Sequence, residues 1–323
     1  MTDTRRRVAR AMLRFALLLA LVSGCATALP TPSPTLIPTA VPTATPTPTP
    51  IPTALPTPPP IPLDQAMLSR RFTLLVIGSD SSLARRNSGL ITWRTDALMV
   101  VSVSADQSHI SMLSLPRDTA DVPLGDGRIY RGKVNSIAEV FGIDGLRKAM
   151  AALLGVPIDR YLMIDMDDFG WIVDAVGGID VEVLTRLSDP KVHLLLDPGP
   201  VQLDGATALA FSRTRADSDY DRAARQQQVV LALMRRWLDR SAPVALIDRL
   251  RLLGSLQTDI TLPELATLIE IGRRAVHAEV TAAVLAPPRF SYFVGVEPDS
   301  TRGWVMIPNV TAMRSYARSL MGD

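Results

Sequence analysis

Three apolar runs early in the chain have the pattern of buried β-strands. They cover residues 72–78, 97–104 and 109–115, and Pro116 ends the third run. Short apolar runs bounded by glycine, proline or polar residues are typical of strands that are covered on both faces. Residues 105–107 separate the second run from the third and predict a short turn. We therefore expect the three runs to be neighbouring strands of one sheet.

Further along the chain, helical and extended patterns alternate without a regular rhythm. The longest helix is expected at about 219–239, where Val229, Val230, Leu233 and Trp237 repeat at a spacing of three and four. The other predicted elements are helices at 142–154, 168–176, 262–275 and 309–320, strands at 161–165 and 179–183, an ambiguous stretch at 206–210 and an extended one at 211–215. This mixture predicts an α/β fold in which helices flank a mixed central sheet, an αβα sandwich.

The amino terminus has the composition of a secretory signal. Arginines at positions 5, 6, 7 and 10 precede an apolar run at 15–22, which is far shorter than the ~20 residues of a membrane-spanning helix. The sequence Val22-Ser-Gly-Cys25 resembles a bacterial lipobox, so residues 1–25 are expected to be a signal peptide and Cys25 the site of lipidation. Several acyl chains on one cysteine would give a stable membrane anchor. A plain signal peptide or an uncleaved anchor is the alternative.

A Pro/Thr-rich stretch separates this signal from the folded part of the chain. Residues 26–62 repeat Pro-Thr and carry no charge. Because proline fixes φ and removes hydrogen-bond donors, this stretch is expected to be an extended stalk of the polyproline-II type. Residues 63–323 remain, which is enough for one large domain with a buried core.

Composition excludes several classes of site. The formal net charge is +2 without a concentrated basic excess, which argues against nucleic-acid binding. Cys25 is the only cysteine, so the chain can form neither an internal disulfide nor a zinc–thiolate site. The three histidines lie far apart, at positions 109, 193 and 277, and this spacing disfavours a histidine metal centre or a Cys/His nucleophile pair.

The predicted strands bring a first group of charges to one edge of the sheet. If residues 72–78 and 97–104 pair antiparallel, Asp80 and Asp96 lie at the same end, and the third strand delivers Arg117 there as well. Paired aspartates suit Mg²⁺ that also binds substrate phosphates, and arginine offers a planar fork to phosphate oxygens. Each aspartate taken alone could equally be a cap or a turn former.

A second group of charges follows in the carboxy-terminal half. Arg213 and Arg215 would share one face of an extended segment, and Arg222, Arg225 and Gln226 share one face of the helix after it. Clustered guanidinium groups repel one another unless an anion lies among them, and a pyrophosphate is the obvious anion. The alternative is a solvated helix face, with aspartates at the helix amino terminus and pairs within the helix.

Several ordered motifs between residues 72 and 240 resemble the LytR-CpsA-Psr family. They are Gly78-Ser-Asp80, Arg94-Thr-Asp96, Leu115-Pro-Arg-Asp-Thr119, Lys133-Val-Asn135, Leu154-Gly-Val-Pro-Ile-Asp-Arg-Tyr161, Val173-Asp-Ala-Val-Gly-Gly178, Leu203-Asp-Gly205 and the block from Arg213 to Gln228. The resemblance implies an αβα sandwich with a long apolar pocket for a polyprenyl chain and a pyrophosphate at the pocket mouth. Family members join secondary cell-wall polymers to peptidoglycan, and some hydrolyse the lipid-linked pyrophosphate instead.

The resemblance also implies roles for single residues. Asp80 and Asp96 match the metal-associated aspartates, with Mg²⁺ as the cofactor. The residues expected to bind the pyrophosphate are Arg94, Arg117, Arg213, Arg215, Arg222, Arg225 and Gln226, of which Arg117, Arg213 and Arg215 are expected to be catalytic.

The expected activity is transfer of a polyprenyl-pyrophosphate-linked glycan to peptidoglycan as a phosphodiester, at the extracytoplasmic face of the membrane. Asp118 and Asp219 are open candidates for a general base. Two other functions are compatible with these residues. The protein could be a hydrolase that uses water as the acceptor, or a binding protein without turnover. The chain departs from many relatives in two ways. It has Ala216 at a position where relatives often have histidine, and it is expected to have a lipid anchor where many relatives have an N-terminal membrane helix.

Overall fold

The computed structural model describes residues 62–80, 94–238, 256–294 and 302–322. Contacts divide the chain into two units, Met1–Pro58 and Pro59–Asp323, and all described residues belong to the second. The predicted signal peptide, the lipidation site Cys25 and almost all of the stalk lie outside the described residues. Within those residues, no helix has the length and hydrophobicity needed to cross a membrane.

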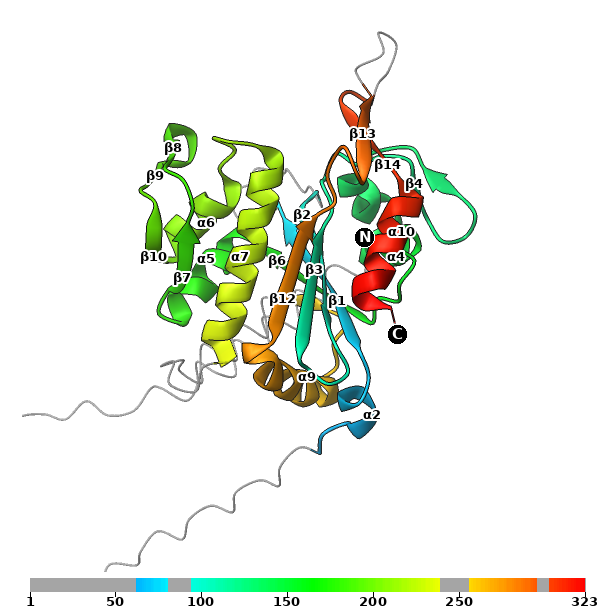
Figure 1. The fold of residues 1–323 in the computed structure, drawn as a ribbon, viewed down its shortest axis with the longest axis horizontal. Coiled ribbons are helices and arrows are strands. Elements are labelled where there is room, and N and C mark those ends of the chain that lie inside the picture. Colours follow the sequence, from blue (N-terminus) through cyan, green and yellow to red (C-terminus); the bar gives the residue numbers. More distant parts are fainter. Residues whose placement is uncertain (1–61, 81–93, 239–255, 295–301, 323) are drawn as a thin grey trace, which may run out of the picture. The chain divides into compact units, whose positions relative to one another are not determined.

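A six-stranded mixed sheet forms the centre of this unit, in the order β11-β6-β1-β2-β3-β12 (Figure 1). Its strands are β1 (Phe72–Ser79), β2 (Thr95–Val103), β3 (His109–Ser114), β6 (Arg160–Asp165), β11 (Gln257–Thr258) and β12 (Glu279–Val284). β2 is antiparallel to both β1 and β3, so β1 and β3 run in the same direction, as predicted. β6 and β12 add parallel strands beside β1 and β3. The predicted α/β fold with a mixed central sheet is confirmed.

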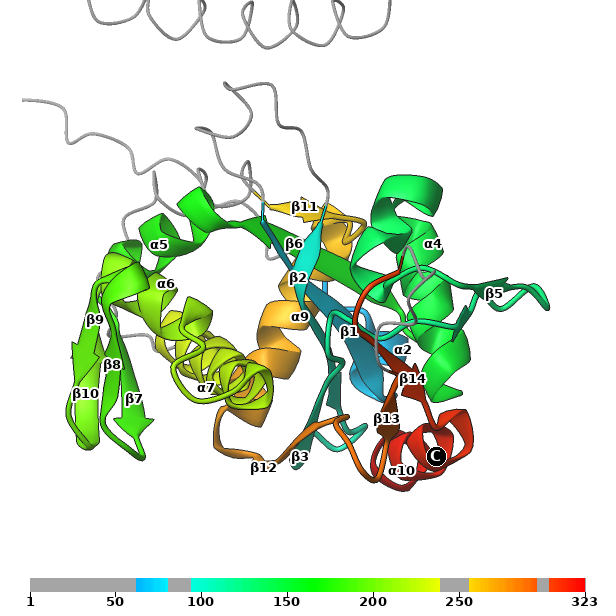
Figure 2. The same ribbon diagram turned by 90° about the horizontal axis from the view of Figure 1, so that it is seen from above.

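Helices cover both faces of this sheet (Figure 2). One face carries Leu75, Leu98 and Leu113, which pack with α4 (Ile137–Leu154) and α10 (Val310–Met321). The other face carries Val76 and Met99, which pack with α7 (Asp219–Leu238). Successive side chains of a strand point to opposite faces, so continuous apolar runs in β1, β2 and β3 supply both cores at once.

A third apolar core lies on the other side of α7. It is built by α5 (Met166–Ala175), α6 (Gly205–Arg213), β7 (Ile179–Val183), β8 (Leu187–Asp189), β9 (Leu194–Leu196) and β10 (Gly199–Leu203). Val181, Leu203 and Phe211 are buried there together with Val229 of α7. The helix α7 therefore contributes to two cores, which explains the wide apolar stripe on its sequence.

The prediction that residues 211–215 are extended is wrong for most of this segment. Residues 205–213 form the helix α6, because the carboxylate of Asp204 caps its amino terminus and accepts a hydrogen bond from the Thr207 amide at 2.8 Å. The helix ends at Thr214, whose φ of −59° and ψ of 142° return the chain to an extended conformation. Arg213 is therefore the last residue of a helix, and Arg215 lies in the loop that follows.

The remaining elements are shorter or lie at the periphery. They are α2 (Gln65–Leu68), β4 (Val122–Pro123), β5 (Ile129–Tyr130), α9 (Leu262–Arg274), β13 (Ser291–Val294), β14 (Val305–Pro308) and the 3₁₀ turns η1 (Val134–Ser136), η2 (Pro190–Val192) and η3 (Ala275–His277).

The predicted helix start at residue 142 is also displaced. α4 begins at Ile137, and Gly142 forms a kink inside it with a φ of 72°.

Candidate functional site

A cavity of about 580 Å³ lies between the central sheet and the helices α5, α6 and α7. Its apolar lining consists of Val76, Ala97, Met99, Ile164, Met166, Phe169, Val192, Leu209, Ala216, Val229 and Val230. Its charged and amide lining consists of Asp80, Asp96, Asp165, Asp189, Lys191, Arg213, Arg215, Arg222 and Gln226. This combination of apolar walls and a few charged groups is the usual composition of a ligand pocket.

Polar and apolar lining residues are segregated along the cavity. On β1 the chain passes from Val76 to Asp80 as it leaves the sheet, and on α7 it passes from Arg222 at the first turns to Val229 two turns later. The carboxyl end of β1 and the amino end of α7 therefore form a charged end of the cavity. The middle of both elements forms an apolar wall, so the cavity suits a ligand with an anionic head and an apolar tail.

The strand pairing explains how Asp80 and Asp96 reach this charged end. The register between β1 and β2 shifts after Gly78, so that Ser79 pairs with Thr95 and Asp96 is an extra residue on β2. Irregularities of this kind re-aim side chains beside functional sites. The Asp80 amide then donates to the carbonyl of Arg94 at 3.0 Å. Both aspartates line the cavity, whereas the exposed Arg94 is not among the residues that line it.

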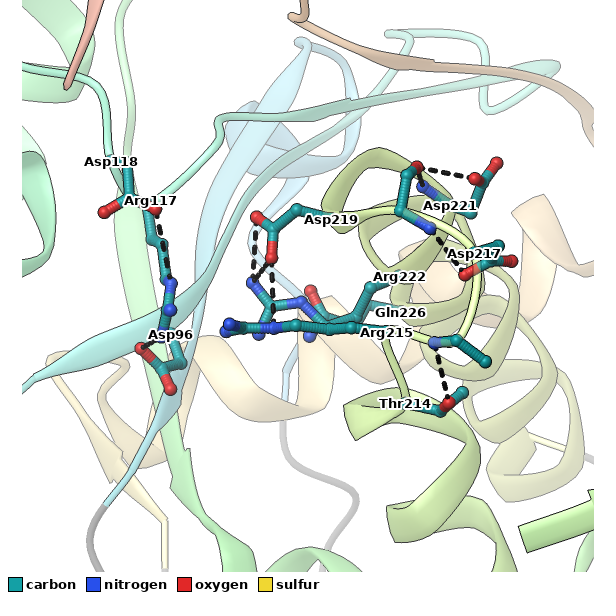
Figure 3. Close-up of polar contacts among 12 residues, drawn as sticks. Asp96, Arg117, Asp118, Thr214, Arg215, Asp217, Asp219, Asp221, Arg222 and Gln226 are labelled. Atoms are coloured by element: carbon teal, nitrogen blue, oxygen red, sulfur yellow. Dashed lines mark hydrogen bonds and ion pairs between the residues drawn. The ribbon is translucent and has the colours of Figure 1, made fainter. Parts of the chain in front are cut away.

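Arg117 lies beside Asp96 at the same edge of the sheet (Figure 3). Its Nη1 donates to Oδ1 of Asp96 at 2.8 Å, and its Nε lies 3.7 Å from Oδ2 of Asp118. Asp118 is in turn held by Lys133, with 2.6 Å between Nζ and Oδ1. Burial lowers the pKa of Arg117, but the carboxylates of Asp96, Asp118 and Asp219 outweigh it and raise the pKa above its usual value. The position of Arg117 is thus fixed by carboxylates from two directions.

Arg222 is a buried guanidinium at the charged end of the cavity. The residue is 5% exposed, and its Nη2 lies 3.0 Å from Oδ1 of Asp219. Its Nε is buried and makes no hydrogen bond to the described residues. Burial lowers the pKa of Arg222, Asp219 opposes this effect, and the positive charges of Arg215 and Arg117 lower the pKa further. Three guanidinium groups therefore act on one another here, and an anion between them would relieve their repulsion.

The carboxylate of Asp219 joins two of these arginines (Figure 3). Its Oδ1 lies 3.2 Å from Nε of Arg215 and 3.0 Å from Nη2 of Arg222. Gln226, one turn beyond Arg222, also lines the cavity and donates to the carbonyl of Ser212 at 3.1 Å. Arg213 completes this group from the end of α6. The end of α6, the loop after it and the first turns of α7 thus contribute Arg213, Arg215, Arg222 and Gln226 to the cavity lining.

The sequence predicted that Arg225 binds the pyrophosphate, but the structure places this residue outside the cavity lining. Its guanidinium donates to both carboxylate oxygens of Asp217, at 2.5 and 2.9 Å, and to the carbonyls of Phe211 and Thr214 at 3.1 and 2.6 Å. Burial raises the pKa of Asp217, but the hydrogen bonds and charge of Arg225 together with the hydrogen bond from the Ser218 amide outweigh it and leave that pKa below its usual value. Arg225 is not among the cavity-lining residues, and its contacts hold the loop that carries Arg215.

Two lining residues on the segment from β8 to η2 were not predicted from the sequence. Asp189 accepts a hydrogen bond from Oγ1 of Thr214 at 2.7 Å, and this contact leads the causes that lower its pKa. Lys191 follows it in the cavity lining. Strands of three residues give too weak a periodic signal to be found in a sequence. Thr214, which donates the hydrogen bond to Asp189, lies inside the Arg-Thr-Arg motif, and this was the sequence signal that could have pointed to a polar partner at this site.

The carboxylates at this site fit one class of metal ion. The described residues contain no group of three or more histidine, cysteine, aspartate or glutamate side chains arranged to hold a metal. The cavity does present the two aspartates Asp80 and Asp96, each at the charged end. Mg²⁺ is commonly bound by one or two carboxylates, with water and substrate phosphates as its other ligands. The donor set therefore fits Mg²⁺ that binds together with a phosphorylated substrate.

Curated relatives cover much of this chain. Polyisoprenyl-teichoic acid–peptidoglycan teichoic acid transferase TagV of Bacillus subtilis is 29% identical over 252 residues, which are 73% of this chain and 62% of TagV. A transferase of the same description, TagU of Bacillus mycoides, is 32% identical over 52% of this chain and 53% of its own length. The matched segments thus span between half and two thirds of these relatives.

Solved structures share the fold. The crystal structure of B. subtilis TagV matches with a TM-score of 0.62 at 26% identity, over 78% of this chain and 96% of that one. A structure described as TagT bound to LIIa-WTA matches with a TM-score of 0.60 at 23% identity, over 79% and 92% of the two chains. At these identities the second match shows the fold alone. The model of the LytR_cpsA_psr family matches residues 60–286, which contain the cavity and both charged clusters, and the chain belongs to this family.

Proposed function

We propose that this protein transfers a glycan from a polyprenyl pyrophosphate carrier to peptidoglycan, as a phosphodiester. The observation that carries the proposal is the segregated cavity, which has an apolar wall along β1 and α7 and guanidinium groups and two aspartates at one end. A polyprenyl pyrophosphate has the matching division into an apolar tail and an anionic head. The relatives TagV and TagU are described as transferases of polyisoprenyl-linked teichoic acid to peptidoglycan, which supports this class of donor and acceptor.

Each end of the cavity would bind one part of the donor. The polyprenyl chain would lie against Val76, Phe169 and Val229, where its burial removes apolar surface from water. The pyrophosphate would lie between Arg213, Arg215 and Arg222, and it would supply the hydrogen-bond acceptor that the buried Nε of Arg222 does not find within the described residues.

Transfer then requires positioning and charge stabilisation more than covalent chemistry. A sugar hydroxyl of the acceptor attacks the phosphorus nearest the glycan. The bond from that phosphorus to the bridging oxygen breaks, polyprenyl phosphate leaves, and the hydroxyl proton is released to solvent. Arg117, Arg215 and Arg222 stabilise the negative charge that builds up on the phosphate oxygens. Mg²⁺ held by Asp80 and Asp96 would add Lewis-acid stabilisation of the same charge.

Asp118 and Asp219 have contacts that suit positioning. Asp118 is ion-paired with Lys133 and lies near Arg117, and Asp219 is ion-paired with Arg215 and Arg222. Both carboxylates are thus engaged by cations that we assign to phosphate stabilisation. We propose that they orient these cations rather than accept the proton of the attacking hydroxyl.

The proposed place of action is the extracytoplasmic face of the cell membrane. The arginine-rich start, the apolar run and the lipobox-like Cys25 support a lipid anchor at this face. The Pro/Thr-rich stretch at 26–62 would separate the anchor from the domain and let it reach the acceptor in the wall. The proposed anchor predicts that the mature chain begins with an acylated Cys25. Mass spectrometry of the chain recovered from membranes tests this prediction.

The activity is tested with a donor that carries a labelled sugar on polyprenyl pyrophosphate. The full-length chain is incubated with this donor and with peptidoglycan that has been stripped of secondary polymers, in the presence of Mg²⁺ or EDTA. We expect label to enter peptidoglycan only with Mg²⁺, and Asp80→Asn to reduce this incorporation strongly. Label released as free sugar phosphate without peptidoglycan would indicate hydrolysis, and label that stays on the lipid in every arm would indicate binding alone.

A further inference from the structure

A hairpin near the carboxyl terminus lies outside the part of the chain that matches the family. β13 and β14 pair antiparallel, with Tyr292 opposite Ile307 and Phe293 opposite Met306. The family match ends at residue 286, before this hairpin begins. Figure 1 shows the hairpin at the end of the molecule where α7 begins. Its residues are therefore candidates for a function that the family match does not assign.

Strand β14 of this hairpin is joined to the loop that carries Arg117. The Met306 amide donates to the carbonyl of Asp118 at 3.0 Å, and the Ala120 amide donates to the carbonyl of Met306 at 2.8 Å. The hydroxyl of Tyr220, in the first turn of α7, lies 3.5 Å from the sulfur of Met306. These contacts fix the hairpin beside the loop that carries Arg117 and beside the first turn of α7.

The hairpin exposes three aromatic side chains although neighbouring residues of β14 are buried. Tyr292 and Phe293 are each 57% exposed and Trp304 is 64% exposed, whereas Val305 and Met306 are 4% and 3% exposed. Exposed large apolar side chains that gather in one place usually mark a binding surface. Tyr292 and Phe293 are neighbours on β13 and therefore point to opposite faces of the hairpin, so we call Phe293 and Trp304 the aromatic hairpin surface.

We propose that the aromatic hairpin surface binds the glycan strand of the acceptor. This inference rests on the proposed transferase function. Aromatic rings have negative faces and offer a large contact area at low entropic cost. The apolar C–H faces of pyranose rings stack against such faces. Since the donor head would occupy the charged end of the cavity, the acceptor has to approach from outside, and β14 is hydrogen-bonded to the loop that carries Arg117.

The nearby arginines favour a glycan over a membrane surface as the occupant. Arg302 lies 3.4 Å from a carboxylate oxygen of Asp121, and the guanidinium of Arg289 stacks over the rings of Phe290 and Tyr316 at 4.9 and 4.8 Å. Surfaces that bind anionic lipids combine apolar residues with basic side chains directed to the head groups. The two arginines closest to this surface in sequence are instead engaged within the protein, and stacking of aromatic rings against sugar rings needs no cation.

The test compares two double variants of the full-length chain. Phe293→Leu with Trp304→Leu keeps the surface apolar but removes the rings, and Phe293→Tyr with Trp304→Phe keeps the rings. The probe is a soluble, uncrosslinked glycan strand of peptidoglycan, and its dissociation constant is measured by calorimetry. We expect the leucine variant to bind roughly tenfold or more weakly and the ring-keeping variant to stay within about twofold of the wild type. Leu184→Ser, which changes a distant side chain that is 85% exposed, should leave binding unchanged.

Binding of geranylgeranyl pyrophosphate separates this inference from the proposed function. We expect all variants to bind this donor analogue as the wild type does. The hairpin proposal is wrong if the leucine variant binds the glycan normally, or if the wild type does not bind it at all. It is also wrong if the leucine variant loses affinity only for vesicles of anionic phospholipid. Failure of the wild type to bind geranylgeranyl pyrophosphate would instead contradict the proposed donor site.

Discussion

Two arginines less than one turn apart on α7 have different surroundings. Arg222 lines the cavity, and its buried Nε has no hydrogen-bond partner among the described residues. Arg225 donates four hydrogen bonds to Asp217 and to backbone carbonyls. A buried cation with incomplete partners lowers stability unless an anion binds it, whereas a fully hydrogen-bonded one holds the chain in place. We therefore expect Arg222 to serve binding and Arg225 to serve folding.

The variant Arg222→Met tests the first half of this division. Loss of one donor to the developing charge should lower the transfer rate by roughly 10²–10³-fold. Its free energy of unfolding should stay the same or rise, because burial lowers the pKa of Arg222 and folding therefore disfavours its charged form. Initial transfer rates and urea denaturation measure the two effects. A variant that transfers at the wild-type rate would exclude Arg222 from the site.

The variant Arg225→Met should have the opposite profile in denaturation. It leaves Asp217 and the carbonyls of Phe211 and Thr214 without their donor, so the free energy of unfolding should fall by about 2–3 kcal/mol. The matched control is Arg186→Met, because the side chain of Arg186 is 67% exposed and its loss should change stability by less than about 0.5 kcal/mol. Equal denaturation midpoints for Arg225→Met and the control would argue against a structural role.

At the scale of elements, a close helix contact holds α6 against α5. A Cβ atom added at Gly205 would lie 2.0 Å from the carbonyl oxygen of Gly170, whereas one added at Gly170 would lie 3.5 Å from the carbonyl oxygen of Gly205. The amide of Gly205 also donates to Asp174 at 2.7 Å. Glycine at position 205 thus lets the two helices approach and sets where α6, with Arg213 at its end, begins.

Two glycine-to-alanine variants test this contact. Gly205→Ala should lower the free energy of unfolding by about 3 kcal/mol, because backbone atoms have to move apart. Gly170→Ala should be neutral or slightly stabilising, because its new methyl group makes an ordinary contact inside a helix. Thermal unfolding of both variants checks the prediction. Similar losses at the two positions would show that the asymmetry of the contact has no energetic consequence.

The ion pair between α9 and β6 predicts a pH dependence of stability. The hydrogen bond from Arg160 leads the causes that lower the pKa of Glu264 from 4.5 to about 2. A carboxylate with a lowered pKa in the folded state stabilises the fold above its unfolded pKa and loses this contribution as the pH falls. Stability should therefore fall between about pH 4.5 and 2, by about 1 kcal/mol after solvent screening. Acid denaturation of Glu264→Gln should lack this contribution, and an unchanged profile would contradict it.

The long elements could be predicted from the sequence, whereas the short ones could not. The apolar runs of β1 and β7 and the stripe on α7 give strong periodic signals, and their observed bounds lie within a residue or so of the predicted ones. β8 and β9 have three residues each, too few for such a signal. Spacing on α7 also placed Arg225 beside Arg222, but it could not indicate that the loop carrying Asp217 folds back to engage Arg225.

At the scale of the whole unit, the direction of the strands decides where the charges meet. β1 and β3 run the same way, so Asp80 after β1 and Arg117 after β3 leave the sheet at one edge, and Asp96 enters β2 there. The sequence predicted this edge because the short turn at 105–107 makes β3 run parallel to β1 once β1 and β2 pair antiparallel. It did not predict how α7 would cross it, since helix packing depends on residues spread over the chain. The packing of α7 brings Arg222 to the same edge and forms the cavity.

The central claim is that this one cavity binds both parts of a polyprenyl pyrophosphate. A crystal structure of the full chain with geranylgeranyl pyrophosphate and Mg²⁺ tests it most directly. We predict that the pyrophosphate lies within hydrogen-bonding distance of Arg215 and Arg222 and that the chain runs along Val76 and Val229. A pyrophosphate bound at another surface, or a chain that lies outside the cavity while the head group is bound, would contradict this account.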